Sequence, residues 1–235
     1  MKGSGLRKES IVKPKPYKDF RKKRVLYIPL DSFSRAVQKA LLGKAAKEKS
    51  TGWGTLYLLP DQVVLYQAVG APASVLILER LIASGVKEIL LLGICGSLSP
   101  NRRIGTAASI SRAYSNEGTS VHYFPQKKIF HPSPALKEKT EVLLKTSGLA
   151  FSESPVVSMD APFRETKLWL EEMRSQRIEL VDMEASAVFA LAEFYGIQAA
   201  ALMIVSDELF SGRWKQRFLS LALEKKIKDY FQIFI

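Results

Sequence analysis

The most constraining feature of this sequence is the stretch of residues 178–209, in which one helix pattern lies between two apolar runs. Residues 178–181 and 199–205 are apolar runs of strand length. From Ala185 the apolar side chains recur at helical spacing, and Gly196 supplies the kind of residue at which such a helix ends. A helix that connects two strands in this way is typical of parallel strands, so the sequence predicts an α/β protein.

Polar residues follow both predicted strands of this stretch. Asp182, Met183 and Glu184 come after the first strand, and Ser206 and Asp207 come after the second. Parallel strands end at the same edge of a sheet, which is where α/β proteins bind ligands. The three carboxylates are therefore expected to converge on one crevice, where such a group can serve a metal, a phosphate or a proton transfer.

Strand and helix patterns alternate through the rest of the chain. Strands are predicted at 25–29, 56–59, 63–69, 88–92, 107–113 and 155–158, and helices at 34–49, 71–84, 136–145, 165–174 and 214–235. This alternation predicts a central mixed, largely parallel sheet flanked by helices. No internal repeat and no second domain is indicated, so residues 24–235 are predicted to form one domain.

The net charge of +12 is concentrated at the start of the chain. The first 24 residues contain ten Lys or Arg against two acidic residues. This Pro- and Lys-rich segment has too little apolar content to fold alone, so residues 1–23 are predicted to be a flexible basic arm, solvated or packed on a neighbouring subunit. Nucleic-acid binding is less favoured because no helix-turn-helix, zinc-finger or RNA-binding signature accompanies the arm.

Cysteine and histidine are scarce in this chain. The single cysteine, Cys95, cannot form an internal disulfide, and with only two histidines a zinc site of the usual kinds is not expected. No apolar run is long enough to span a bilayer, and no apolar core follows the basic start as in a signal peptide. We therefore expect a cytoplasmic protein with no membrane partner and no metal.

Four segments together resemble the purine/uridine phosphorylase family, which also includes the methylthioadenosine nucleosidases. They are VDMEASAVFALAEFYGI at 181–197, IVSDEL at 204–209, GAPASVLILERLIASGVKEILLLGICGSL at 70–98 and EGTSVHY at 117–123. The resemblance implies a three-layer α/β/α fold, a homo-oligomer, and cleavage of the N-glycosidic bond of a nucleoside. It implies no cofactor, with phosphate as a candidate co-substrate.

The resemblance assigns the catalytic work to Glu184 and Asp207. Glu184 would accept hydrogen bonds from the ribose hydroxyls, and its charge would oppose the cation that develops on the sugar. Asp207 would protonate or hydrogen-bond a purine at a ring nitrogen, as general acid catalysis of base departure requires. For that role Asp207 should hold its proton more tightly than a solvated carboxylate does.

A second group of residues is expected to bind the nucleoside without doing chemistry. Phe163 would stack on the base, with core packing as the alternative, and Arg164 would reach the edge of the base. Met183 would pack against the sugar, and Asp182 would support its neighbours rather than act on the substrate. The remaining members of this predicted set are Ser206, Cys95 and Gly96.

The phosphate-binding half of the family pattern is not matched. Leu30 stands where a glycine is expected, and Leu91 and Ile94 replace an arginine and a Ser or Thr, so three anion-binding groups are missing. Candidates for the phosphate or nucleophile side are Asp31, Arg35, Ser97 and Thr119, with Arg102 and Arg103 as further substitutes. The alternative hypothesis is therefore a nucleoside-binding or regulatory protein that has lost activation of the nucleophile.

Overall fold

A computed structural model describes residues 10–30, 35–218 and 220–235, without the side chains of residues 35–36. The strands are β1 (Arg24–Ile28), β2 (Lys47–Ser50), β3 (Thr55–Leu58), β4 (Val63–Tyr66), β5 (Glu88–Ser97), β6 (Ala107–Asn116), β7 (Ile129–Phe130), β8 (Ser152–Met159), β9 (Leu180–Asp182), β10 (Gln198–Glu208) and β11 (Lys215–Gln216). The helices are α1 (Arg35–Lys44), α2 (Ala71–Ala83), α3 (Pro134–Thr146), α4 (Lys167–Ser175), α5 (Ala185–Tyr195) and α6 (Leu221–Phe231). Short 3-10 turns lie at Ser120–His122 and Pro162–Arg164.

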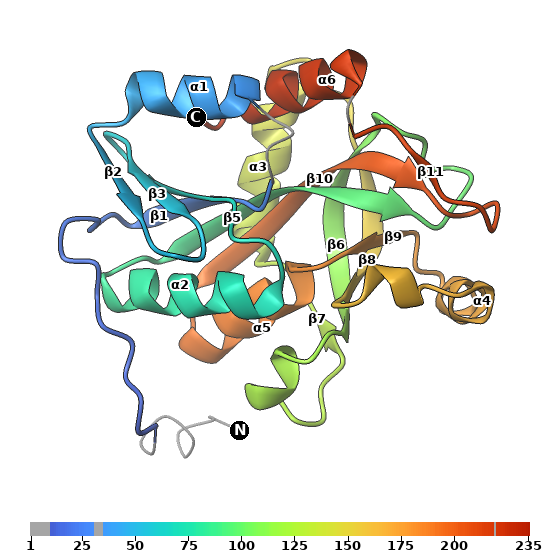
Figure 1. Ribbon diagram of the computed structural model, residues 1–235, viewed down its shortest axis with the longest axis horizontal. Helices are drawn as coiled ribbons and strands as arrows, with labels where there is room; N and C mark the ends of the chain where they lie inside the picture. Colours follow the sequence, from blue (N-terminus) through green and yellow to red (C-terminus); the bar gives the residue numbers. More distant parts are fainter. Residues whose placement is uncertain (1–9, 31–34, 219) are drawn as a thin grey trace.

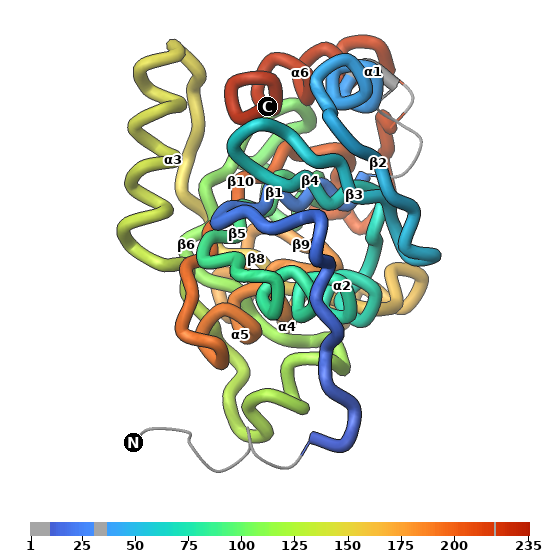
Figure 2. The backbone as a smooth tube through the Cα atoms, turned by 90° about the vertical axis from the view of Figure 1, so that its left-hand side faces the viewer, coloured from blue at the N-terminus to red at the C-terminus, as the bar shows by residue number. Residues whose placement is uncertain are grey.

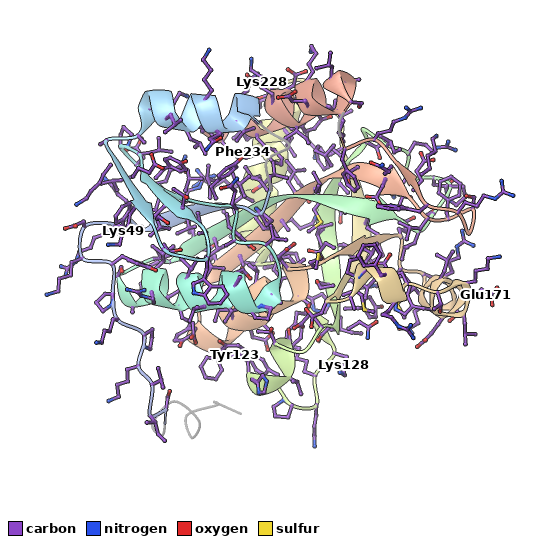
Figure 3. All side chains as sticks on the ribbon, viewed as in Figure 1. Lys49, Tyr123, Lys128, Glu171, Lys228 and Phe234 are labelled. Carbon is purple, nitrogen blue, oxygen red and sulfur yellow. The ribbon has the colours of Figure 1, made fainter. Side chains whose placement is uncertain are left out.

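Helices cover both faces of one mixed sheet (Figure 1), which confirms the predicted α/β/α class. One core cluster joins the sheet to α2 and α5, and a second joins it to α1, α3 and α6, on the opposite side in Figure 2. The sheet contributes to both clusters because successive side chains of a strand point to opposite faces. In β1, Val25 and Tyr27 belong to the first cluster, whereas Leu26 and Ile28 belong to the second. Charged side chains such as Lys228 on α6 lie on the outside of these layers (Figure 3).

Five central strands, β5, β10, β6, β8 and β9, pair in a closed ring. Strand β5 pairs with β10 on one side and β9 on the other, and the ring continues from β10 through β6 and β8 to β9. The β5–β10 pair is parallel but the β5–β9 pair is antiparallel, so the prediction that β9 and β10 run parallel is wrong. An apolar run before a helix carries no information on strand direction; pairing with β5 and β8 decides it here.

The ends of β9 and β10 nevertheless meet, because both pair with the last residues of β5. Gly96 lies opposite Val181 of β9 and opposite Asp207 of β10. The short β9 reaches this point from the opposite direction, and its last residue is Asp182. The predicted convergence is therefore confirmed, although by ring closure rather than by a parallel β-α-β unit.

Two predicted helices are shorter than expected. The helix predicted at 34–49 ends at Lys44, and the following residues form β2, which pairs antiparallel with β3. The helix predicted at 214–235 begins only at Leu221, where the Ser220 side chain accepts a hydrogen bond from the amide of Leu223. Trp214 therefore lies outside that helix, in a hairpin that includes β11.

The basic segment before β1 packs on the body of the protein over its described part. Tyr17 and Phe20 are buried in the cluster that contains α2. The Arg80 guanidinium lies over the Tyr17 ring at 3.9 Å, and Lys47 pairs with Asp19 at 2.7 Å. Packing thus begins upstream of the predicted domain boundary at residue 24. Among the described residues no helix is long and apolar enough to cross a membrane.

Candidate active site

A pocket of about 470 Å³ opens where β5, β9 and β10 end. Its lining comes from these strands, the turn at Pro162–Arg164, the β11 hairpin and the loops after β1 and β4. The lining residues are Pro29, Val69, Ile94, Cys95, Gly96, Pro162, Phe163, Glu165, Val181, Asp182, Met183, Glu184, Ser206, Asp207, Leu209, Trp214 and Phe218. The structure thus brings together eight of the residues predicted from the sequence: Asp207, Glu184, Met183, Asp182, Phe163, Ser206, Cys95 and Gly96.

One side of the pocket, here named the Glu184 wall, consists of Asp182, Met183 and Glu184 before α5. Asp182 is buried and its Oδ2 accepts hydrogen bonds from the amides of Glu184 at 3.1 Å and Ala185 at 2.7 Å. Its Oδ1 accepts a third from the Ser158 hydroxyl at 2.6 Å. Asp182 thus binds the start of α5 and fixes the backbone that carries Glu184, which is the supporting role predicted for it.

The Glu184 carboxylate is buried and reaches toward the loop before α2. Its Oε1 accepts a hydrogen bond of 2.6 Å from the amide of Gly70. Gly70 has φ 88° and ψ 149°, a conformation that essentially only glycine adopts, so this amide can point inward. Burial, and next the negative charge of Asp182, raise the pKa of Glu184 well above its ordinary value. A ligand that offers hydroxyl donors would favour the ionised form.

A buried acid that the sequence analysis did not single out lies behind this wall. Glu117 accepts hydrogen bonds from the hydroxyls of Ser115 at 2.7 Å and Ser186 at 2.9 Å, and from the amides of Thr119 and Ser120. Burial raises the pKa of Glu117, but the hydrogen bonds from Ser120, Ser115 and Thr119 outweigh it and lower that pKa overall. Glu117 therefore holds the start of α5 against the loop after β6 and does not line the pocket.

The opposite side, here named the Asp207 wall, is built at an irregularity in β10. The register with β5 shifts between Val205 and Asp207, so Ser206 is one residue extra in the strand. The Ser206 hydroxyl donates to Asp207 Oδ1 at 2.7 Å, and the Trp214 indole N–H donates to Oδ2 at 2.8 Å. Burial raises the pKa of Asp207, and the two donors partly offset that rise. A pKa above the ordinary value is what the acid role requires.

A second carboxyl group, that of Glu165, lines the same pocket as Asp207 and was missed in the sequence. Glu165 follows the turn at Pro162–Arg164, and burial together with the charge of Asp207 raises its pKa to about 7. Its position directly after the polar cluster at residues 158–164, which lies at the end of a predicted strand, was the available signal. We therefore add Glu165 and Trp214 to the candidate site.

Gly96 and Cys95 form the floor between the two walls. A Cβ on Gly96 would lie 2.8 Å from Leu209 Cδ1, 3.0 Å from Val181 Cγ1 and 3.1 Å from Asp207 Oδ2, so a larger residue there would displace the tips of these side chains. The Cys95 thiol is buried, and burial followed by the charges of Asp207 and Asp182 raises its pKa. Cys95 is therefore a small apolar lining residue and no nucleophile.

The structure places the two residues predicted to contact the base, Phe163 and Arg164, differently with respect to the pocket. Phe163 lines the pocket with 92% of its surface exposed, so its ring lies at the mouth and is not packed in a core. Arg164 is exposed and does not line the pocket. Of the two, only Phe163 is placed where it can cover a bound ring.

The predicted phosphate side receives little support from the described residues. Ser97 is buried with its hydroxyl on the Ser99 carbonyl at 2.8 Å, and Thr119 lies in the Glu117 loop, so neither lines the pocket. Arg102 and Arg103 form ion pairs of 2.9 Å with Glu179 and Glu208. Asp31 and the side chain of Arg35 lie outside the described residues.

The described lining has acidic side chains and is otherwise mostly apolar. It contains the carboxyl groups of Glu165, Asp182, Glu184 and Asp207, and no Lys, Arg or His. Pro29, Val69 and Ile94 offer no side-chain donor on the side where the family pattern binds phosphate. Within residues 10–30, 35–218 and 220–235, no three His, Cys, Asp or Glu side chains are grouped as metal ligands would be.

Comparison with known proteins agrees with this arrangement. Residues 54–227 match the family model described as "Phosphorylase superfamily". A guanosine phosphorylase of Halorubrum lacusprofundi is 28% identical over 172 residues, which cover 72% of this chain and 70% of that protein. A DeoD-type purine nucleoside phosphorylase of Bacillus cytotoxicus is 26% identical over 149 residues, 61% of this chain and 62% of that protein.

Solved structures show the same fold at lower sequence identity. Purine nucleoside phosphorylase from Toxoplasma gondii, in complex with immucillin-H, has a TM-score of 0.77 at 18% identity, covering 92% of this chain and 90% of that one. The 5'-methylthioadenosine/S-adenosylhomocysteine nucleosidase from Helicobacter pylori has a TM-score of 0.72 at 18% identity, covering 92% and 97%. These two likenesses bear on the fold alone.

Proposed function

This chain belongs to the phosphorylase superfamily, and we propose that it is an enzyme that cleaves the N-glycosidic bond of a purine-type nucleoside. One observation carries the proposal. A single pocket has two buried carboxyl groups with raised pKa values on opposite walls: Glu184, which accepts a hydrogen bond from the Gly70 amide, and Asp207, which accepts one from the Trp214 indole. The first suits a sugar that becomes cationic, and the second suits a base that must receive a proton.

The reaction divides between the two walls. As the bond between the sugar and the base breaks, its electron pair moves onto the base. The Asp207 O–H bond breaks, and its proton goes to a ring nitrogen of the base. Ionised Glu184 accepts hydrogen bonds from the ribose hydroxyls and stabilises the positive charge on the sugar, while Met183 packs against the apolar face of the ring. Phe163 covers the base from the mouth of the pocket.

Water is the nucleophile that the described lining favours. A phosphate dianion would enter a pocket that holds four carboxyl groups and no described cationic side chain. Phosphorolysis is the second candidate, because the relatives from Halorubrum lacusprofundi and Bacillus cytotoxicus are named phosphorylases. In the hydrolytic reaction the sugar product is ribose, whereas in phosphorolysis it is ribose 1-phosphate.

The test is base release from purified protein. Guanosine, inosine, adenosine and uridine are incubated with and without inorganic phosphate, and free base and the sugar product are quantified by chromatography. We expect release from purine nucleosides at a rate that phosphate does not raise. Release that requires phosphate would replace hydrolysis by phosphorolysis. No release in either condition would overturn the enzymatic proposal, and thermal stabilisation by nucleosides would then indicate a binding protein.

We also expect a cytoplasmic homo-oligomer that needs no cofactor beyond its co-substrate. Light scattering of the purified protein measures the assembly, and a monomer at micromolar concentration would contradict it.

A further inference from the structure

The segment after Asp207 folds back over that residue. Leu209 and Gly212 form a turn closed by a hydrogen bond of 2.8 Å, and β11 then pairs antiparallel with the end of β10. Asp207 lies opposite Gln216 in this pair, two residues beyond Trp214. The hairpin thus returns Trp214 to the carboxyl group that precedes it by seven residues.

Trp214 is held at the pocket by few contacts. Its side chain is 59% exposed, and its ring meets Phe218 at a centroid distance of 6.1 Å. Its indole N–H donates to Asp207 Oδ2 at 2.8 Å. A large ring that is mostly in solvent gains little from burial, so this hydrogen bond is the main directional contact of the indole among the described residues.

The donors on Asp207 differ in what they can do. Indole N–H donates only, and therefore favours the ionised carboxylate over the protonated acid. The Ser206 hydroxyl has a second acceptor, the Cys95 carbonyl at 3.2 Å, so it can turn away when Oδ1 binds a proton. Ser206 can accommodate both states of Asp207, whereas Trp214 becomes a stronger partner as the proton leaves.

We propose that Trp214 is a positioning residue for Asp207, whose indole N–H orients the carboxyl group toward the base and stabilises the carboxylate that forms when the proton is transferred. The inference rests on the proposed function and adds a residue to it. In the step concerned, the Asp207 O–H bond breaks, an N–H bond forms on the departing base, and the negative charge left on Oδ2 is met by the indole. The glycosidic electron pair ends on the base. In hydrolysis water bonds to the sugar and releases one proton to solvent, from which Asp207 is reprotonated before the next turnover. In phosphorolysis an anionic phosphate oxygen bonds to the sugar, and that oxygen loses no proton.

The kinetic test uses Trp214→Phe, which keeps an aromatic ring and removes the N–H. We expect kcat to fall roughly tenfold with little change in KM, because the lost hydrogen bond acts mainly on the ionised carboxylate. The descending alkaline limb of the kcat profile should move to higher pH, because loss of a donor to the ionised form raises the pKa of Asp207. An unchanged kcat with an unchanged pH profile would overturn the inference.

Two comparisons distinguish positioning of Asp207 from two other roles of Trp214, stacking of its ring on the nucleoside and stabilisation of the fold. In an Asp207→Asn background, Trp214→Phe should cause no further loss of kcat, because it acts through Asp207. An additional tenfold loss would overturn the proposal. Trp53 is 60% exposed and does not line the pocket, so Trp53→Phe is the matched control and should keep wild-type kcat and pH profile.

A spectroscopic test does not depend on turnover. A variant with Trp53→Phe and Trp169→Phe keeps Trp214 as the only tryptophan of the chain. Its emission should titrate with pH, and that titration should vanish on adding Asp207→Asn. Among the described residues, the charge of Asp207 raises the pKa of Glu165 and of Cys95, so both lie near it; Glu165→Gln should leave a titration in place. If the pH titration of the Trp214 emission were unchanged by Asp207→Asn, the proposed hydrogen bond between Trp214 and Asp207 would be overturned.

The two sets of data separate the failures. A wild-type protein that releases no base would overturn the proposed function and the catalytic role of Trp214 with it, while the fluorescence titration would still report whether the indole senses Asp207. An active wild type with a Trp214→Phe variant of equal kcat and equal pH profile would overturn the Trp214 inference alone.

Discussion

The two walls of the pocket hold their carboxyl groups in different ways. On the Glu184 wall the donors are mostly backbone amides: Gly70 donates to Glu184, and the amides of Glu184 and Ala185 donate to Asp182. On the Asp207 wall both donors are side chains, those of Ser206 and Trp214. The first arrangement is fixed by the course of the main chain, and the second depends on two replaceable residues.

This difference matches the work proposed for each wall. A group that only accepts hydrogen bonds from a sugar needs one geometry and one charge, which backbone donors supply without side-chain entropy to lose. A group that gives up a proton must be stable in two protonation states, and a hydroxyl that can turn serves both. Variants should therefore affect binding and turnover together on the Glu184 wall, and turnover alone on the Asp207 wall.

The largest effect is expected from Asp207→Asn. The amide keeps the size of the carboxyl group but has no acidic proton, so kcat should fall by about 10²–10⁴, the usual contribution of a general acid. Nucleoside affinity should change by much less. Single-turnover base release measures the first quantity, and thermal shift with a non-cleaved nucleoside analogue measures the second. Equal losses in both would remove the contrast between the walls.

Glu184→Gln should give a smaller loss of a different kind. Gln accepts hydrogen bonds without the charge, and removal of a charge-assisted hydrogen bond weakens both the bound and the activated sugar by about 1.5–3 kcal/mol. We expect a fall of roughly 10- to 100-fold in kcat/KM, with nucleoside affinity lowered as well. Isothermal titration and steady-state kinetics on the same preparation compare the two, and a variant that lost kcat while binding normally would contradict it.

The affinity for a nucleoside should also depend on pH through Glu184. Its pKa is raised in the free protein, first by burial and then by Asp182, and ribose hydroxyls that donate to the ionised form would lower that pKa in the complex. Affinity is therefore full above the raised pKa and falls as the pH drops through it, starting well above the ordinary value of 4.5.

The slope of that dependence is at most about tenfold per pH unit, because one proton is involved. Titrations at a series of pH values with the non-cleaved analogue measure it. Glu184→Gln supplies the control, since its affinity should lose this dependence. A wild-type affinity that is constant as the pH falls through this window would show that Glu184 is already ionised in the free protein.

The residues of the two walls also differ in how well they could be predicted from the sequence. The acidic residues of the Glu184 wall and Asp207 stand next to strand and helix patterns, so their convergence could be predicted from spacing and family resemblance. Trp214 could not, because it was itself assigned to the C-terminal helix, which begins only at Leu221. Glu165 was assigned to a helix, and its place in the same pocket as Asp207 depends on how distant strands pair.

Strand direction was the other quantity that local pattern could not supply. The apolar run that ends at Asp182 reads the same in either direction, and only its pairing with β5 and β8 makes it antiparallel to β10. The site survives this error because both strands end beside Gly96. The position of a residue at a strand end was therefore more informative than the predicted orientation of the strand.

The smallest expected effect comes from Gly96→Ala, which touches both walls at once. The new Cβ would lie 3.0 Å from Val181 Cγ1 on one side and 3.1 Å from Asp207 Oδ2 on the other, with Leu209 Cδ1 at 2.8 Å. These are tips of side chains that can shift, so we expect a loss of about 1–3 kcal/mol in the free energy of unfolding.

The matched control is Gly93→Ala on the same strand, whose Cβ would meet nothing closer than 3.8 Å. Denaturant unfolding should show the loss for Gly96→Ala and little change for Gly93→Ala. Because the Asp207 wall is held by side chains, the displaced carboxyl group should also lower kcat several-fold, while affinity, set by the backbone-held Glu184 wall, stays near that of the wild type. A Gly96→Ala variant that lost affinity and kept kcat would contradict this prediction, because it would show that the new methyl group disturbs the Glu184 wall more than the Asp207 wall.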